Sequence, residues 1–334
     1  MTQAYKDAIV LDTMGSWTKR RPTAGQGSFI DQALANGITM MAETVVADNE
    51  QWTWREVLRW FDDFHWIIDW YSSKMLLVET TEDILRAKRE HKLGYMAMLQ
   101  GANSIFEDLA ILRLLHRLGL RSMSLTYMRS NALGGGCQEP NDMGLTKFGQ
   151  QVVAEMNRIG VAVDLSHVGY KTAMDALKIT KKPVICTHSN VQAKTSHSRN
   201  LPDDEIKAIS ETGGVIAITP VAVFCRDNSG HRPTLTNVVD HIEHVIDLVG
   251  IEHVGISTDR LIGDVLDEQM VLSKAAREYF TAFGLSGKHA EGFEDFSGYP
   301  KIAQCLQQRG YSDQELKAIL GGNFLRVFKE IWGA

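Results

Sequence analysis

The stretch Val161–His167 reads VAVDLSH, and three later stretches follow the same pattern: PVICTHS at 183–189, GVIAITP at 214–220 and HVGISTD at 253–259. Each is a short, nearly continuous apolar run that ends in a polar group. Strands of a parallel sheet that is buried on both faces read in this way, because neither face alternates with solvent. Longer segments with helical spacing lie between the runs, which predicts parallel strands joined by helical crossovers.

Eight such runs can be placed along the chain, and eight parallel strands alternating with helices favour a closed barrel over an open sheet. The predicted strands are Ala8–Asp12, Ile38–Val46, Tyr95–Gln100, Ser122–Tyr127, Val161–Ser166, Val184–His188, Val215–Thr219 and Val254–Thr258. The first strand leads into LDTMGSW, which lacks the glycine-rich phosphate loop of a dinucleotide-binding fold. We therefore expect an α/β protein with a TIM-type (β/α)8 barrel and additional helices, including a C-terminal helical segment.

The composition of the chain suits one barrel domain over residues 1–334, because 44% of its residues are apolar and 23% are charged. The formal net charge is -6 and no dense basic run occurs, so nucleic acid is not an expected partner. No window approaches the ~20 uninterrupted apolar residues of a membrane span, so a membrane is not expected either. The segment MTQAYKDAIVLD at 1–12 has no charged region followed by an apolar one, and we expect a cytoplasmic protein.

The segment Trp52–Tyr71 is apolar over an unusually wide arc for a helix of a barrel wall. Val57, Phe61 and Phe64 lie on one face, and tryptophans extend the apolar surface beyond it. Two arrangements would bury these side chains: packing beneath the C-terminal tail, or a subunit interface, whose core is commonly rich in aromatic residues. A homodimer is therefore one of two expectations for this helix.

The reacting groups of a parallel barrel sit where its strands end at their carboxyl termini. These positions hold Asp12, Gln100, Tyr127, His167, His188 and Asp259, and Arg199 follows a short loop after the sixth strand. Two imidazoles on neighbouring strands can bind one cation as neutral nitrogen donors. Structural interpretations stand beside the functional ones: a lone strand-end histidine is often only hydrogen-bonded, Asp259 could cap the next helix, and Arg199 could form a surface ion pair.

His241 and His244 also have a spacing that resembles metal ligands on a helix. However, HIEHVIDLV at 241–249 is an ordinary amphipathic pattern, so no metal is expected there. The four cysteines are scattered without a CxxC pair and are expected to be reduced thiols.

Six separated segments resemble the signature segments of the renal, or membrane, dipeptidase family of zinc metallopeptidases, a group with an amidohydrolase-like barrel. They are MNRIGVAVDLSHVGYKTAMDA at 156–176, KPVICTHSNVQA at 182–193, HSRNLPDDEIKAI at 197–209, GGVIAI at 213–218, HVGISTD at 253–259 and GGNFLRVF at 321–328. They follow one another in the order of the family. The resemblance implies hydrolysis of a dipeptide by a water that bridges two zinc ions, with an aspartate that shuttles the proton to the leaving amine.

The resemblance also implies roles for individual residues. His167 and His188 match two ligands of one metal ion, and Asp259 matches the proton-shuttling aspartate. Arg199 matches the arginine that binds the carboxylate of the substrate, with Asn200 beside it in the substrate site. Tyr127 stands where the family has a histidine that assists carbonyl binding, and tyrosine keeps a hydrogen-bond donor there.

Three departures concern the metal ligands. Met14 and Ser16 stand where the family has His-x-Asp, and Gln100 replaces the glutamate that bridges the two ions. A thioether, a neutral hydroxyl and a neutral amide are poor substitutes for these ligands, although Gln100 can act as a weak one. We therefore expect at most one weakly bound zinc ion. The leading hypothesis is a dipeptidase-like hydrolase of a small carboxylate-bearing substrate, and the alternative is a catalytically impaired relative that only binds small molecules.

Overall fold

A computed structural model describes residues 1–17, 28–48, 51–227, 231–262 and 289–333. Its strands are β1 (Leu11–Trp17), β2 (Met40–Ala47), β3 (Met75–Leu77), β4 (Leu93–Gln100), β5 (Leu120–Ser124), β6 (Ala162–Asp164), β7 (Ile185–Cys186), β8 (Val215–Ile218), β9 (Val254–Ile256) and β10 (Arg260–Ile262). They pair in parallel in the order β10-β1-β2-β4-β5-β6-β7-β8-β9, and β3 pairs with β4 at the side. Every residue of β4 is buried, as expected of a strand covered on both faces.

The barrel closes through an eighth strand that is divided into two short pieces. β9 pairs with β8, and β10 pairs with β1 on the other side of the gap. Asp259 lies between the two pieces with φ 49°, in the left-handed region that few residues other than glycine adopt. The eight predicted runs therefore correspond to the eight positions around the ring, and the prediction of a (β/α)8 barrel is confirmed.

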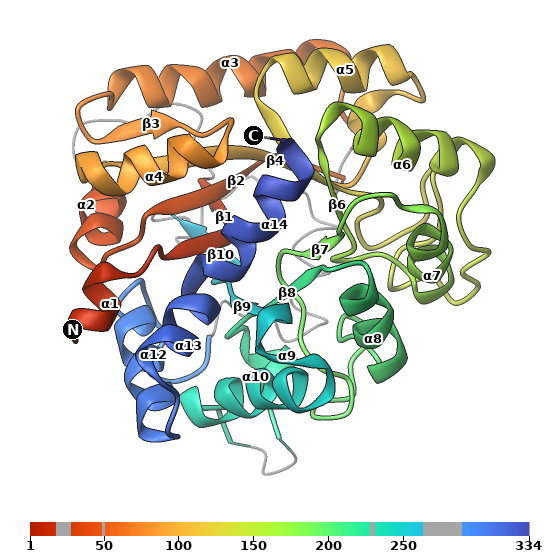
Figure 1. Cartoon of the computed structure of the whole chain (residues 1–334). Coiled ribbons are helices and arrows are strands. Elements are labelled where there is room, and N and C mark those ends of the chain that lie inside the picture. The colour runs from red at the N-terminus through yellow and green to blue at the C-terminus, as the bar shows by residue number, and fades with distance from the viewer. Residues whose placement is uncertain (18–27, 49–50, 228–230, 263–288, 334) are drawn as a thin grey trace.

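Helices surround the strands (Figure 1). They are α1 (Gln3–Asp7), α2 (Ser28–Ala35), α3 (Trp54–Trp70), α4 (Thr81–Glu90), α5 (Leu109–Arg117), α6 (Lys147–Ile159), α7 (Tyr170–Ile179), α8 (Asp203–Glu211), α9 (Ala222–Cys225), α10 (Leu235–Val249), α12 (Gly298–Gln308), α13 (Asp313–Lys317) and α14 (Asn323–Trp332), with short turns η1 (Asn103–Ile105), η2 (Ile251–His253) and η4 (Ala318–Gly322). Several begin with capping boxes, such as Thr53 with Glu56 at α3 and Thr80 with Asp83 at α4. No helix in these ranges is both long and apolar enough to span a membrane.

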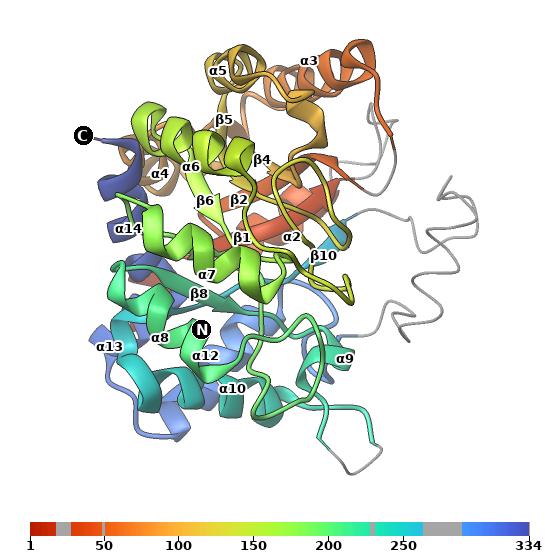
Figure 2. The ribbon, with the colours of Figure 1, turned by 90° about the vertical axis from the view of Figure 1, so that its right-hand side faces the viewer.

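The C-terminal helical segment covers one end of the barrel. α14 contacts β6, β8 and β9, and Phe324 and Phe328 share an apolar cluster with Met40, Met96 and Val215. Figure 2 shows α14 at one end of the barrel, while β10 points toward the opposite end. Since α14 covers one end, the carboxyl ends of the strands form the end that is available for a ligand.

The first strand differs from its prediction. It begins at Leu11 rather than Ala8 and continues to Trp17, well beyond Asp12. Residues 8–10 lie outside the strand and follow α1, whose N-terminus is capped by the Thr2 hydroxyl. The extension arises from tertiary pairing, because β10 lies beside 15–17 and supplies hydrogen-bonding partners that the local sequence does not announce. Met14 and Ser16 are therefore strand residues and not loop residues.

The aromatic helix α3 does not pack beneath the C-terminal tail, so this prediction is wrong. Its buried residues, among them Val57, Phe61 and Phe64, face β2 and β3, whereas α14 packs against α4 and the barrel strands. Trp66 and Trp70 stack on each other at 4.9 Å, and Trp70 is 65% exposed. The other arrangement, a subunit interface, stays a prediction.

Candidate active site

Polar side chains follow several strands at the open end of the barrel. β4 ends at Gln100, His167 follows β6, and His188 follows β7. The two imidazoles point their Nε2 atoms at each other at 2.8 Å, and Nε2 of Gln100 lies 2.9 Å from Nε2 of His188 and 3.5 Å from Nε2 of His167. All three side chains are buried. The structure therefore brings together three nitrogen atoms from β4 and from the neighbouring strands β6 and β7.

The surroundings of both histidines favour the neutral imidazole. Burial, together with the positive charge of Arg199, lowers the pKa of His167 and of His188 well below the ordinary value. A neutral imidazole has one nitrogen with a free lone pair, which is the form that binds a metal ion. The electrostatics of the site therefore favour ligand chemistry over proton transfer at these two residues.

A buried chain of hydrogen bonds determines which nitrogen of His188 carries the proton. The Thr187 hydroxyl donates to the Asp164 carboxylate at 2.5 Å, and its oxygen lies 2.7 Å from Nδ1 of His188. Because the single hydroxyl proton goes to Asp164, the Thr187 oxygen accepts from Nδ1–H. The lone pair of His188 is then on Nε2, which faces the site. Asp164 is held by the backbone N–H groups of Ser166 and Thr187.

We expect Thr187→Val to lower the free energy of unfolding by about 1–3 kcal/mol, since an Asp164 oxygen and Nδ1–H of His188 would both lose their buried partner. Valine has nearly the volume of threonine, so the loss does not come from a cavity. Thr187→Ser keeps the hydroxyl and is the matched control, with a loss of about 0.8 kcal/mol for one methyl group. Denaturant unfolding measures both, and equal losses would contradict the role of the hydroxyl.

His167 is held by contacts on several sides. Its φ is 71°, a conformation that non-glycine residues seldom adopt, and its carbonyl accepts from the Cys137 N–H at 2.8 Å. Nδ1 lies 3.3 Å from the sulfur of Met128, and the Tyr127 ring packs on the imidazole with 4.3 Å between ring centres. Burial raises the pKa of Tyr127, so its hydroxyl keeps the proton and remains a hydrogen-bond donor.

Asp259 occupies the closure of the barrel. Its N–H donates to the carbonyl of Met14 at 3.1 Å. The preceding Thr258 donates its N–H and hydroxyl to the carboxylate of Asp12, at 2.9 and 2.7 Å, and the Ser257 hydroxyl donates to the same carboxylate at 3.2 Å. Asp12 therefore supports the closure and is occupied by structural hydrogen bonds. The alternative that Asp259 caps a following helix is wrong, because β10 follows directly.

The carboxyl group of Asp259 has an unusually high pKa. Burial is the main reason that its pKa is raised to about 7; the charge of Arg199 acts against this rise and that of Asp12 adds to it. General acid–base catalysis is most effective when the pKa of the group lies near the pH at which the protein works. Asp259 can therefore both accept and release a proton near neutral pH.

Arg199 is 3% exposed, so the alternative that it forms a surface ion pair is wrong. Its Nη2 donates to the carbonyl of His188 at 2.7 Å and its Nη1 to the hydroxyl of Ser189 at 3.1 Å, and the guanidinium packs 5.6 Å from the ring centre of Phe224. Its Nε has no hydrogen-bond partner within the described part of the chain. The guanidinium is thus oriented by the protein and retains N–H groups for an anionic ligand.

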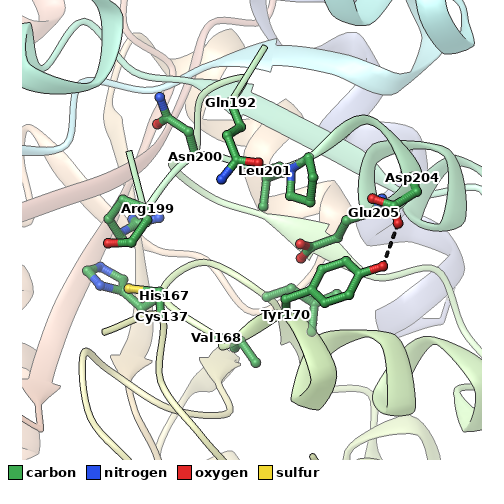
Figure 3. A pocket seen from close by; sticks show the side chains of 13 residues that line it. Cys137, His167, Val168, Tyr170, Gln192, Arg199, Asn200, Leu201, Asp204 and Glu205 are labelled. Atoms are coloured by element: carbon green, nitrogen blue, oxygen red, sulfur yellow. Dashed lines mark hydrogen bonds between the residues drawn. The ribbon is translucent and has the colours of Figure 1, made fainter. Parts of the chain in front are cut away.

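A cavity of about 350 Å³ opens beside these residues. Figure 3 shows His167, Cys137 and Arg199 along one side of it, with Tyr170 and Glu205 along the other. Asn200 also lines it: its amide nitrogen donates to two backbone carbonyls at 2.8 and 2.9 Å, while its oxygen has no partner among the described residues. Of the predicted site residues, His167, Arg199 and Asn200 line this cavity, whereas Gln100, Tyr127, His188 and Asp259 are not among the residues that line it.

The residues present do not fit two metal ions. Met14 is buried in an apolar cluster, and although Ser16 lies in β1, its side chain falls outside the described residues. In the described ranges, no group of three or more His, Cys, Asp or Glu side chains could hold a metal ion. His167 and His188 offer two nitrogen donors, and a rotated Gln100 amide would add a weak oxygen donor.

The sequence interpretation missed two features of the site. One is Glu205, which lines the cavity and is buried together with Ile206 and Ile209 on α8. The hydrogen bonds of Asp164 and Thr187 were also missed. Helical spacing is the signal that could have found Glu205, because positions 205, 206 and 209 share the inner face of one helix.

His241 and His244 both make polar contacts within the protein. Nδ1 of His241 accepts from the N–H of Val191 at 3.0 Å, and Nε2 of His244 lies 2.8 Å from an Asp203 carboxylate oxygen. Each imidazole therefore has a partner that accounts for its position on α10.

The profile of the membrane dipeptidase family (peptidase family M19) matches residues 32–270 and 281–333. The chain belongs to this family. It is 32% identical to the dipeptidase verJ of Clonostachys rogersoniana over 288 residues, which are 86% of this chain and 68% of that protein. It is 30% identical to the dipeptidase tcpJ of Claviceps purpurea over 279 residues, 83% of this chain. The chain spans only 60% of the length of the latter relative.

A solved structure supports the same assignment. An amidohydrolase from Pseudomonas aeruginosa superposes with a TM-score of 0.86 at 27% identity, and the match covers 99% of both chains. The resemblance found in the signature segments is therefore confirmed, and family membership implies a metal cofactor, although the number of ions is a separate matter.

Proposed function

We propose that this chain hydrolyses the amide bond of a dipeptide or of a similar small substrate with a free carboxylate. The observation that carries the proposal is Arg199, a buried guanidinium with an unused N–H that lines a cavity next to His167. A carboxylate is the natural partner of such a planar group. The relatives verJ and tcpJ are named dipeptidases, which supports the same reaction.

Each site residue has a proposed task. Arg199 binds the carboxylate of the substrate, and Asn200 presents its free amide oxygen to a substrate donor. Tyr127 donates a hydrogen bond to the carbonyl oxygen as negative charge develops on it. Asp259 takes a proton from the attacking water and delivers it to the leaving amine, a task that suits a carboxyl with a pKa of about 7.

His167 and His188 are proposed to hold at most one divalent ion, zinc, with Gln100 as a weak third ligand. When bound, the ion would polarise the substrate carbonyl and lower the pKa of the attacking water. Two neutral imidazoles without a carboxylate leave the charge of a dication poorly neutralised, so binding should be weak.

We expect the purified protein to contain less than one zinc ion per chain, to gain up to one on supplementation, and to lose it readily to a chelator. Elemental analysis after gel filtration measures this content. The variant carrying Met14→His, Ser16→Asp and Gln100→Glu together should hold more metal, whereas each single change should do little, because ligands act as a unit. Two tightly held ions in the unmodified chain would contradict the proposed site.

Hydrolysis itself is tested with a panel of dipeptides at saturating zinc, by following the release of free amino acids. The second candidate function is binding without turnover, which is favoured by the burial of Met14 in apolar surroundings. Dipeptides that bind in calorimetry but are never cleaved would select this alternative.

Three further expectations stay predictions. They are the single domain over residues 1–334, the cytoplasmic location and the homodimer through α3.

A further inference from the structure

Glu205 is a buried acidic residue that has no role in the proposed hydrolysis. It is the third residue of α8, it is 2% exposed, and its Oε1 has no hydrogen-bond partner among the described residues. A buried carboxyl oxygen that lacks a partner destabilises the folded protein. Figure 3 shows the carboxyl group pointing into the cavity, between Tyr170 and the side that carries Arg199. A ligand in the cavity would supply the missing partner.

The charges around Glu205 favour a positively charged ligand group. Burial, together with the neighbouring carboxylates of Asp204 and Asp142, raises the pKa of Glu205 to about 8, although the charge of Arg199 acts in the opposite direction. The surrounding acids repel an anion and attract a cation. A cation placed against the carboxyl group would also stabilise its ionised form.

Two opposite recognition groups therefore share one cavity. Arg199 lies on one side with an unused N–H donor, and Glu205 lies on the other with an unused acceptor. The volume of about 350 Å³ lies within the range of small-molecule sites. A molecule with a carboxylate and, at some distance from it, a cationic group would satisfy both residues at once.

We propose that Glu205 is a specificity-determining residue that binds a cationic side chain, such as that of lysine, on the residue whose carboxylate binds Arg199. The proposal rests on the proposed function in so far as Arg199 binds the C-terminal carboxylate of a dipeptide. The preferred substrates are then dipeptides that end in a basic residue, and free lysine is one product.

The binding of lysine and of norleucine tests this proposal without any need for catalysis. The two amino acids differ in the terminal group of the side chain, an ammonium in one and a methyl in the other. Isothermal calorimetry is carried out with the L and the D form of each amino acid. For one of the two configurations, lysine should bind about 10- to 100-fold more tightly than norleucine, as expected for a hydrogen bond to a charged group. In Glu205→Gln, which keeps the size of the side chain, this preference should disappear.

Two further variants separate a direct contact from a general effect of negative charge. Asp204→Asn removes an exposed carboxylate of the same cavity, one that accepts from the Tyr170 hydroxyl, and it should leave the preference nearly unchanged because exposed charges are screened. Glu205→Asp keeps the charge and should retain part of the preference. Circular dichroism checks that each variant is folded. Equal binding of lysine and norleucine by the unmodified protein, or an equal loss in Asp204→Asn and Glu205→Gln, would overturn the proposal.

Cleavage of Gly-Lys and Gly-norleucine distinguishes this inference from the proposed function. If lysine is preferred in binding but neither dipeptide is cleaved, the hydrolase proposal fails and the role of Glu205 stands. If both dipeptides are cleaved with equal kcat/KM and lysine shows no advantage in binding, the hydrolase proposal stands and the role of Glu205 is refuted.

Discussion

Asp259→Asn should reduce kcat by about 10²–10⁴-fold while leaving KM nearly unchanged, because a positioned general acid–base group acts only while a proton is being transferred. Asparagine has nearly the same shape and does not titrate near neutral pH. Steady-state kinetics on the best dipeptide of the panel, at saturating zinc, measure both constants. An unchanged kcat would refute the assignment of Asp259 as the proton-transferring group.

The pH dependence of stability provides a control for the same substitution. The pKa of Asp259 is raised from 3.8 to about 7, so the folded protein holds this proton more tightly than the unfolded chain does. The stabilising contribution is therefore fully present below about pH 4 and is lost as the pH rises through about 7. Denaturant unfolding should show that Asp259→Asn gains stability relative to the unmodified protein between these two pH values. A kinetic defect together with this gain shows that the lost activity is not caused by unfolding.

Arg199→Lys should raise KM by about 10- to 100-fold with a smaller effect on kcat, since a hydrogen bond to a charged group contributes about 1.5–3 kcal/mol. Lysine keeps the positive charge but loses the planar fork that matches a carboxylate. The arginine contacts its substrate in both the ground state and the transition state, and uniform binding of this kind appears in KM.

A dipeptide amide is the matched control for Arg199, because it lacks the carboxylate. The unmodified protein should bind the amide as poorly as Arg199→Lys binds the free dipeptide, and the variant should scarcely distinguish the two ligands. This double comparison separates the contact with the carboxylate from the hydrogen bonds that Arg199 makes to His188 and Ser189. If Arg199→Lys weakens the binding of the amide and of the free dipeptide by the same factor, Arg199 supports the structure of the site and does not contact the carboxylate.

Much of the barrel was predictable from local patterns. The apolar runs that end at Gln100, His167 and His188 indicate buried parallel strands, and polar residues at their ends indicate a site, because both properties depend on burial of a few consecutive residues. The helix that begins after Pro202 was predictable for the same reason, since its acidic first turn is a local signal. The order of the strands predicts only in part which of these polar groups contact one another.

By itself, the sequence determined the order of eight strands, the positions of the polar strand ends, and the departures from the family ligands at Met14 and Gln100. Only the tertiary structure decided that the eighth strand divides at Asp259, that Thr187 orients His188, and that Glu205 is buried opposite Arg199. The physical reason is the distance along the chain over which each kind of interaction acts. Periodicity and burial act over a few residues and leave a trace in the sequence, whereas these contacts require barrel closure and helix packing, which join residues far apart in the chain.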